Sequence, residues 1–222
     1  MTNFQAGVVA ADVEGTLTGG VMWKAIDRFM ISHGCQSERD GFIRQNRWGA
    51  LKYRLGLGDR QAFRNNWIIA QARLLQGFSA EEMDMLANWV IEHDFWPKRR
   101  QAVIDEVLNW QSQGATLVLA SGLYQPIVTA FARCMGRDIL AIGTQLAFTS
   151  EGFSGEFSGP ICNGKEKALR VADLIRDQPL LAAYGDSLSD VPMLSLSRQP
   201  VAVFPEKTLL KHAQAQGWRV IL

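Results

Sequence analysis

Hydrophobic residues follow two patterns along this chain: short continuous apolar runs, and longer stretches in which they recur every three or four positions. The short runs are typical of buried strands, and the wider spacing is typical of amphipathic helices. Helices are predicted at residues 101–113, 124–135 and 165–175, with a short one at 191–196. Strands are predicted at residues 7–12, 115–121, 180–186 and 200–204, and residues 138–157 contain a strand and then a hairpin turning at Ser150–Gly152. This alternation predicts an α/β fold with a Rossmann-like, doubly wound parallel sheet.

A long segment without predicted strands separates the first strand from the second. From Val21 to about Asp94 apolar residues recur at helical spacing, and Ser79 with Glu82 three positions later predicts a capping box. We interpret residues 19–96 as an inserted, all-helical cap that lies above the strand ends. The α/β core then comprises residues 1–18 and 97–222.

Polar residues follow three of the predicted strands, at the edge where open α/β sheets bind ligands. A single Asp, Ser or Lys in such a place is often only a turn former, a helix cap or a solvated side chain. Together, however, these residues would bring carboxylates, a hydroxyl and an ammonium group to one edge. The first strand ends in Asp12 and Glu14, the second in Ser121 and Gly122, and the fourth in Asp186 and Asp190, while the helix before the fourth strand begins with Lys165 and Lys167.

This combination of groups predicts phosphoryl chemistry. Carboxylates that face one another repel unless a cation neutralises them, and oxygen ligands suit Mg²⁺. A cation held there would attract a phosphate, whose other oxygens a serine and a lysine can bind. One carboxylate can attack phosphorus and form an acyl phosphate. The second, two positions later, points to the same side of the strand and can exchange a proton with the leaving alcohol and with water.

Four segments resemble the motifs of one family, the haloacid dehalogenase superfamily of phosphohydrolases. In chain order they are DVEGTLT, LVLASG, GPICNGKEKALRV and YGDSLSDVPML. The chain is most similar to the phosphoserine-phosphatase-like branch, in which a helical cap lies between the first and second motifs. The resemblance implies a Mg²⁺-dependent phosphomonoester hydrolase that acts through an aspartyl phosphate on a small phosphorylated metabolite.

The same resemblance implies a role for each matching residue. The nucleophile would also bind the metal, and the second acid of the first motif would be the general acid/base with its backbone carbonyl on the metal. The roles fall on Asp12 as nucleophile, Glu14 as acid/base, Ser121, Gly122 and Lys167 as phosphate ligands with Lys165 as the alternative lysine, and Asp186 as a metal ligand with Asp190 beside or behind it.

Two positions depart from the family pattern. The family has Asp where this chain has Glu14, and the extra methylene moves the carboxylate about 1.5 Å further along its stem. Because a misplacement of ~1 Å can cost about a hundredfold in rate, catalysis is expected to be slow or altered unless the strand or the cap compensates. Phosphoserine phosphatases carry a Glu nine residues after the nucleophile, where this chain has Val21, and this argues against phosphoserine as the substrate.

Composition and charge narrow the class of protein. The chain has 222 residues, 47% of them hydrophobic, and a net charge of +1, so no global charge favours nucleic acid or membrane. The start lacks the features of a signal peptide, no apolar run approaches the ~20 residues of a membrane span, and the three cysteines show no metal or disulfide spacing. We therefore expect a cytoplasmic monomer or homodimer that acts on a small-molecule phosphomonoester, without a membrane or nucleic-acid partner.

The predicted cap is locally basic. Residues 41–75 hold seven Lys or Arg and one Asp, with aromatic residues between them. A solvated basic face over an apolar core stripe accounts for this pattern. Alternatively, Arg44 and Arg47 face the cleft and favour an anionic substrate.

Two other functions compete with the phosphatase. A carbon–halogen hydrolase of the same superfamily uses the nucleophile without a second acid or a metal, and Glu14 and Asp186 argue against it. A catalytically weak or inactive binding protein with the same fold is the second alternative, and Glu14 is the feature in its favour.

Overall fold

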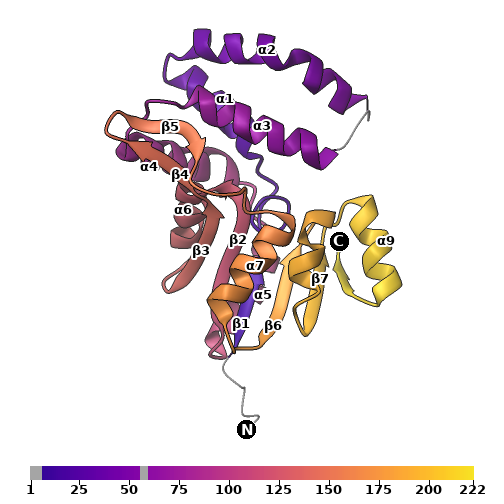
Figure 1. Cartoon of the computed structure of the whole chain (residues 1–222). Helices are drawn as coiled ribbons and strands as arrows, with labels where there is room; N and C mark the ends of the chain where they lie inside the picture. Colours follow the sequence, from indigo (N-terminus) through magenta and orange to yellow (C-terminus); the bar gives the residue numbers. More distant parts are fainter. Residues whose placement is uncertain (1–6, 56–59) are drawn as a thin grey trace.

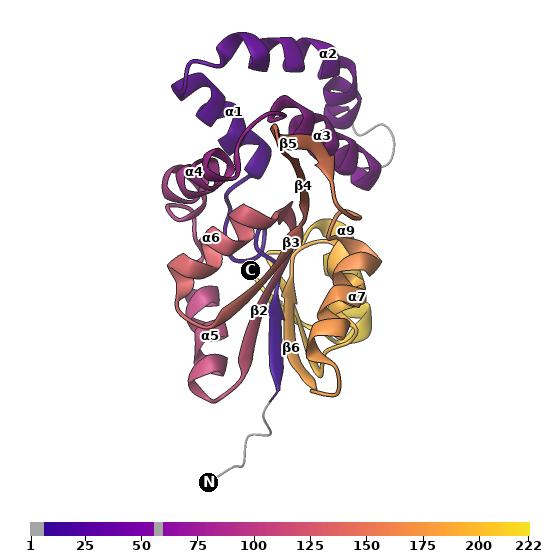
Figure 2. The same ribbon diagram turned by 60° about the vertical axis from the view of Figure 1, so that its left-hand side comes forward.

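A six-stranded parallel sheet forms the centre of the molecule (Figures 1 and 2). The structure is a computed structural model that describes residues 7–55 and 60–222. The strand order is β3-β2-β1-β6-β7-β8, and every paired neighbour is parallel. The strands are β1 (Val8–Ala11), β2 (Thr116–Tyr124), β3 (Ile139–Thr144), β6 (Leu180–Gly185), β7 (Gln199–Val203) and β8 (Arg219–Ile221).

Helices cover both faces of this sheet. Residues 9 and 11 of β1 pack in one hydrophobic cluster with α5 and α6, whereas residues 8 and 10 pack in a second cluster with α7, α8 and α9. Successive strand side chains point to opposite faces, so a strand that is buried on both faces reads as a continuous apolar run. The predicted doubly wound fold is confirmed, although α9 and β8 were not predicted. The helices are α5 (Gln101–Ser112), α6 (Gln125–Met135), α7 (Gly164–Ile175), α8 (Val191–Leu194) and α9 (Lys207–Gln216), with a 3₁₀ turn at Leu188–Asp190.

Between β1 and α5 the chain forms a group of helices that stands above the carboxyl ends of the strands (Figure 2). The predicted capping box is present, because Ser79 Oγ accepts from Glu82 N and the Glu82 carboxylate accepts from Ser79 N. Both views place α2 beyond α3, on the side away from the sheet. The helices are α1 (Met22–Ser32), α2 (Gln36–Arg54), α3 (Arg60–Leu74), α4 (Ala80–Val90) and a π-helical turn at Ile91–Phe95.

An antiparallel hairpin from the second half of the chain reaches this helical cap. It consists of β4 (Leu146–Thr149) and β5 (Gly152–Phe157), joined at the predicted turn. Phe153 exchanges backbone hydrogen bonds with the segment after α3, donating to Phe78 O at 2.7 Å and accepting from Gly77 N at 2.8 Å. The hairpin, which the sequence analysis assigned to the core, is thus hydrogen-bonded to the segment between α3 and α4. The domain limits of residues 1–18, 19–96 and 97–222 stay a prediction.

Two linkers, residues 15–21 and 94–100, join the cap to the core and are bonded to each other. Gly19 N donates to Lys98 O at 3.0 Å, and Arg100 N donates to Leu17 O at 2.8 Å. The Thr18 hydroxyl donates to Phe95 O at 2.6 Å. The two connections between cap and core are therefore not independent of each other, because hydrogen bonds join them into one unit. We call residues 15–21 and 94–100 the linker pair.

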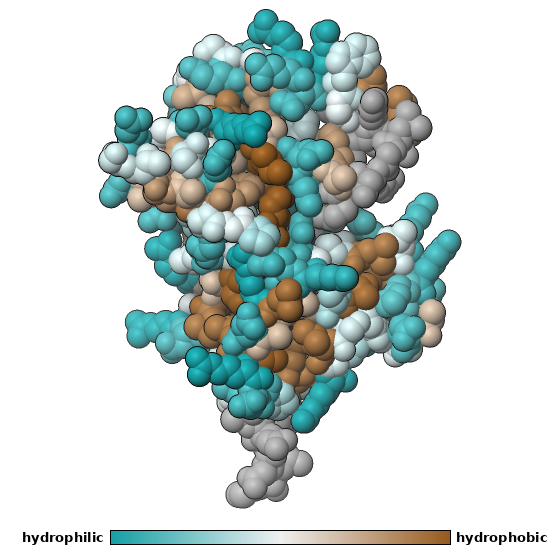
Figure 3. Space-filling model, in the orientation of Figure 1, coloured by the Kyte–Doolittle hydropathy of each residue, from teal (hydrophilic) through white to brown (hydrophobic). Residues whose placement is uncertain are grey.

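The surface in Figure 3 mixes polar and apolar side chains, and its upper edge along α2 is mostly hydrophilic. Among the described residues, no helix has both the length and the apolar composition that a membrane crossing requires. The cytoplasmic location expected from the sequence stays a prediction.

Candidate active site

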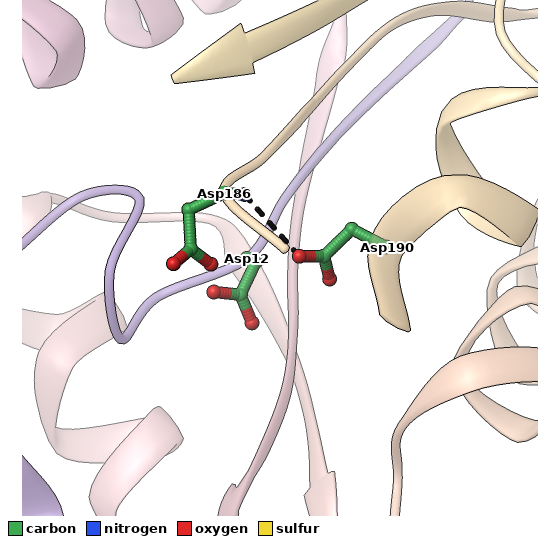
Figure 4. Close-up of side chains that lie close together, drawn as sticks. All are labelled: Asp12, Asp186 and Asp190. Carbon is green, nitrogen blue, oxygen red and sulfur yellow. Dashed lines mark hydrogen bonds between the residues drawn. The ribbon is translucent and has the colours of Figure 1, made fainter. Parts of the chain in front are cut away.

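Three aspartates meet at the carboxyl ends of β1 and β6 (Figure 4). Asp12 directly follows β1, Asp186 directly follows β6, and Asp190 closes the 3₁₀ turn after it. Because β1 and β6 are parallel neighbours, their ends lie side by side. Each residue offers a carboxylate oxygen, and these three atoms lie within 4.8 Å of one another.

Lys167 is the cation of this acid cluster. It lies on the first turns of α7, and its Nζ is 2.7 Å from Asp12 Oδ1 and 2.6 Å from Asp190 Oδ1. Only 2% of the residue is exposed. Burial disfavours the ammonium form, but the charges of Asp12 and Asp190 outweigh it and raise the pKa of Lys167. Lys165 is exposed and takes no part in these two ion pairs of the cluster.

One ammonium group does not balance three carboxylates. Burial raises the pKa of Asp12, against the charge of Lys167. Burial and then the charges of Asp12 and Asp190 raise the pKa of Asp186 to about 9. A further cation would therefore bring the charge of this site closer to neutral.

Hydroxyl groups complete the surroundings of Asp12. Ser121 is buried near the end of β2, and its side chain lowers the pKa of Asp12, against the effect of burial. The Thr16 hydroxyl donates to Asp12 Oδ2 at 3.3 Å. Gly122 follows Ser121 in β2, and its carbonyl accepts from the Thr144 hydroxyl at 2.9 Å. Thr16 was not predicted as a site residue, although it lies inside the DVEGTLT segment.

Asp190 also shapes its own loop. Its Oδ2 accepts from Ser187 N at 3.0 Å, from the Ser187 hydroxyl at 2.9 Å and from Asp186 N at 3.2 Å. A Cβ on Gly185 would lie 2.5 Å from Asp190 Cβ, so only glycine fits there. These contacts fix the turn that presents Asp186 to Asp12.

Glu14 reaches from the core to the cap. Its Oε2 accepts from Met22 N, the first amide of α1, at 2.7 Å. Helix α1 has no acidic residue in its first turn, and its N-cap residue Val21 makes no side-chain cap bond. A carboxylate at a helix N-terminus satisfies an otherwise unpaired donor and is stabilised there. The additional methylene of Glu14 lengthens the reach of its carboxylate from the core.

A second remote carboxylate, that of Asp94, serves the same helix end and was missed by the sequence analysis. Its Oδ1 accepts from Val21 N at 3.0 Å, and its Oδ2 pairs with Arg28 and, at 2.6 Å, with Lys98 Nζ. The residue is fully buried. A buried carboxylate requires such partners. Lys98 lies four positions after Asp94, a spacing that the sequence shows, but Val21 and Arg28 are distant along the chain, so no local pattern predicts their contacts with Asp94.

The cap meets the core at the start of α7. Asn65 of α3 accepts a hydrogen bond from the Asn163 side chain at 2.8 Å, directly before α7. Arg44 and Arg47 lie elsewhere: both are exposed on α2, and the Arg47 guanidinium is 5.6 Å from the Trp48 ring centre. Helix α2, which carries both arginines, lies beyond α3 on the side away from the sheet (Figure 1).

Comparisons with known sequences point to one family. The model of the family described as haloacid dehalogenase-like hydrolase matches residues 9–195. Protein CicA of Caulobacter vibrioides is 38% identical over 91 residues, which is 40% of this chain and 40% of that relative. A histidinol-phosphatase of Neisseria meningitidis is 29% identical over 223 aligned positions, covering 95% of this chain and 96% of the relative.

Solved structures support the same fold. A protein of unknown function from Bordetella pertussis superposes with a TM-score of 0.81 at 21% identity, over 98% of this chain and 99% of that one. A probable phosphoserine phosphatase from Vibrio cholerae superposes with a TM-score of 0.67 at 16% identity, over 98% of this chain and 60% of that one. At these identities the likeness concerns the fold alone.

Proposed function

Because the chain belongs to the haloacid dehalogenase-like hydrolase family, we propose that it is a phosphatase that hydrolyses small phosphomonoesters with Mg²⁺ as cofactor. The observation that carries this proposal is the contact of Asp12 with a buried lysine, a serine hydroxyl and two further aspartates at one end of the sheet. A nucleophile, anion ligands and metal ligands are the parts that such a reaction needs.

Asp12 is the proposed nucleophile. One of its carboxylate oxygens attacks phosphorus, the bond from phosphorus to the ester oxygen breaks, and an aspartyl phosphate forms. The leaving oxygen takes a proton from Glu14. A water then attacks phosphorus, gives its proton back to Glu14 and releases phosphate with a free Asp12.

Lys167, Ser121 and the backbone at Gly122 are the proposed phosphate ligands. Lys167 bonds to Asp12, and the Ser121 side chain is close enough to lower the pKa of Asp12, so both lie within reach of a group attached to that carboxylate. Charge-assisted hydrogen bonds of this kind hold a phosphoryl group firmly. Lys165 is not needed in this scheme.

The acid cluster fits Mg²⁺. Asp12, Asp186 and Asp190 place hard carboxylate oxygens within 4.8 Å of one another, and burial, followed by the charges of Asp12 and Asp190, raises the pKa of Asp186 to about 9, an effect that a bound cation would oppose. Asp12 and Asp186 would hold the ion, with the Glu14 carbonyl, while Asp190 supports Asp186 through its amide. When bound, the ion would neutralise charge on the phosphoryl oxygens.

The substrate is a phosphorylated small molecule whose leaving group faces the cap. Val21 still argues against phosphoserine. The relative from Neisseria is named a histidinol-phosphatase, which makes histidinol phosphate a compound to include in a substrate panel. An anionic leaving group bound by Arg44 and Arg47 stays a prediction, and their exposed places on α2 do not support it.

The first experiment measures phosphate release over a panel of metabolites, with Mg²⁺ and with a chelator. Activity should require Mg²⁺ and should be lost in Asp12→Asn and Asp186→Asn, whereas Asp173→Asn, an exposed aspartate of α7, should match wild type. Mg²⁺ should also raise the melting temperature of wild type and not of Asp186→Asn, since a ligand of the folded state stabilises it.

Each alternative function has its own outcome in this experiment. Full activity in Asp12→Asn would refute the assigned nucleophile. Halide release from a haloacid without Mg²⁺ would favour a dehalogenase. Binding of a phosphorylated compound without turnover would favour the inactive binding protein.

A further inference from the structure

The side chain of Arg100 holds the backbone that follows Glu14. Its Nη1 donates to the carbonyl oxygens of Gly15 and, at 3.3 Å, Thr16. The guanidinium also lies 4.2 Å from the ring centre of Phe204, just after β7. Arg100 is the residue at which the second linker enters α5. It therefore connects the turn of the first motif with the segment that follows β7.

The turn that Arg100 binds is pressed against Asp186. Gly15 has φ of +92°, and a Cβ there would lie 2.2 Å from Asp186 Oδ2. Asp186 thus limits the turn on one side, while Arg100 holds its carbonyl oxygens. The backbone of residues 15 and 16 has little freedom to move between them.

The guanidinium of Arg100 bonds to backbone and not to a carboxylate. Within the part of the chain that the structure describes, Arg100 takes part in no ion pair, and its side-chain hydrogen bonds go to two carbonyl oxygens. Burial lowers the pKa of Arg100, and the more distant charge of Asp186 opposes that effect. A partly buried guanidinium bonded to two carbonyl groups points to a need for a fixed backbone at this place.

We propose that Arg100 is a positioning residue for proton transfer by Glu14. By clamping the Gly15–Thr16 turn it fixes the stem from which the Glu14 carboxylate reaches the leaving group. The backbone bonds of the linker pair begin at the next residue, where Arg100 N donates to Leu17 O, so Arg100 also connects the cap linkers to the turn after Glu14. The proposal rests on the phosphatase function proposed above.

Leaving-group dependence tests this role. A good leaving group departs without a proton, whereas a poor one needs the acid. We would compare kcat/KM, which reports the steps up to the aspartyl phosphate, for dinitrophenyl phosphate and for phenyl phosphate. Arg100→Met should lower kcat/KM about hundredfold for phenyl phosphate, since ~1 Å of misplacement has that effect, and less than about threefold for dinitrophenyl phosphate.

Three further variants sharpen the test. Arg100→Lys keeps the charge but not the planar fork and should give an intermediate loss with phenyl phosphate. Arg99→Met is the matched control, because Arg99 is exposed, contacts Trp96 and should leave both rates unchanged. In a Glu14→Gln background, Arg100→Met should add little further loss, since residues that act through one another are not additive.

The outcomes separate this inference from the proposed function. If wild type hydrolyses neither ester with Mg²⁺, the phosphatase function fails. If wild type is active and Arg100→Met loses both activities equally, or if its effect adds fully to that of Glu14→Gln, the positioning role is overturned. Should Arg100→Met fail to fold, the same comparison in Arg100→Lys decides the question.

Discussion

At the scale of single residues, Gly15 shows how closely the first motif is packed. Its positive φ is a conformation that glycine adopts readily and other residues adopt at a cost. The adjacent Asp186 carboxylate leaves no space for a side chain. The glycine is therefore required for two independent reasons, its backbone conformation and its contact with a site residue.

Substitution of Gly15 should separate these two reasons. Gly15→Ala should reduce activity at least about a hundredfold, since it must displace Asp186 or the turn by more than ~1 Å. Gly34→Ala is the control, because Gly34 also has a positive φ, +77°, but no neighbouring atom lies within 4 Å of the position that a Cβ would take. Gly34→Ala should cost only about 1 kcal/mol in the free energy of unfolding and leave activity intact. Equal activity losses in the two variants would contradict the steric account.

A single contact accounts for the presence of Glu, and not Asp, at position 14. The sequence raised the concern that its carboxylate is displaced by one methylene. In the structure that carboxylate bonds to the first amide of α1, so the longer side chain has a partner in the cap. The proposed proton transfer then involves an acid that is anchored to the cap.

At the scale of elements, the N-terminus of α1 depends on carboxylates from outside the helix. Glu14 binds Met22 N, and Asp94 binds Val21 N. Asp94 also neutralises Arg28 of α1 and Lys98 of the second linker. The same carboxylate therefore fixes one end of a cap helix to the linker pair.

Removal of Asp94 should destabilise the protein. Asp94→Ala leaves the Val21 amide without its acceptor, whereas the side chains of Arg28 and Lys98 are each 46% exposed and can turn to water, so the expected cost is about 1–3 kcal/mol. Asp94→Asn should cost less, because the amide oxygen can still accept from Val21 N. Chemical denaturation measures both, with Asp84→Ala on the exposed face of α4 as the control. A loss below about 1 kcal/mol in Asp94→Ala would show that the contact is not a structural anchor.

At the scale of the whole molecule, hydrogen bonds connect the last strand, β8, to helix α5, which precedes β2 in the chain. Arg219 of β8 pairs with both oxygens of Glu106 in α5, at 2.5 and 2.8 Å. Glu106 Oε1 also accepts from the Tyr184 hydroxyl at 2.7 Å, which in turn accepts from Trp110 Nε1 at 2.9 Å. This network joins β8, β6 and α5, which are far apart in the sequence.

The network predicts a pH dependence of stability. The hydrogen bond from Arg219 lowers the pKa of Glu106 below its usual 4.5, against the effect of burial. Stability from a lowered carboxyl pKa is fully present above the unfolded value and is lost as pH falls through the folded value. The free energy of unfolding of wild type should thus fall more steeply below about pH 4.5 than that of Glu106→Gln.

The expected difference is small, because the pair is partly exposed: at neutral pH Glu106→Gln should cost a few tenths to about 1 kcal/mol. Glu156→Gln, an exposed substitution in β5, is the matched control and should follow the wild-type pH profile. Identical slopes in wild type and Glu106→Gln below pH 4.5 would refute the network's contribution.

Much of the architecture follows from local sequence. The continuous apolar runs predicted the strands of a doubly covered sheet, because a strand buried on both faces needs apolar residues at successive positions. The alternation with helices predicted the parallel topology, and the topology brought Asp12, Ser121 and Asp186 to one edge. The cap was recognisable because the spacing of apolar residues changes after the first strand, from a continuous run to every three or four positions. By contrast α9 and β8 were not predicted, since β8 is only three residues long and α9 has few buried residues.

The sequence by itself therefore determined the sheet, the helical insertion and the residues at the strand ends, because these depend on periodicity and on the direction of neighbouring strands. Only the tertiary structure decided which side chains touch across long separations. Arg100 lies 85 positions from Gly15, and Asp94 lies 73 positions from Val21. Neither contact leaves a local pattern, since a hydrogen bond between distant segments depends on how the chain folds back and not on the residues beside each partner.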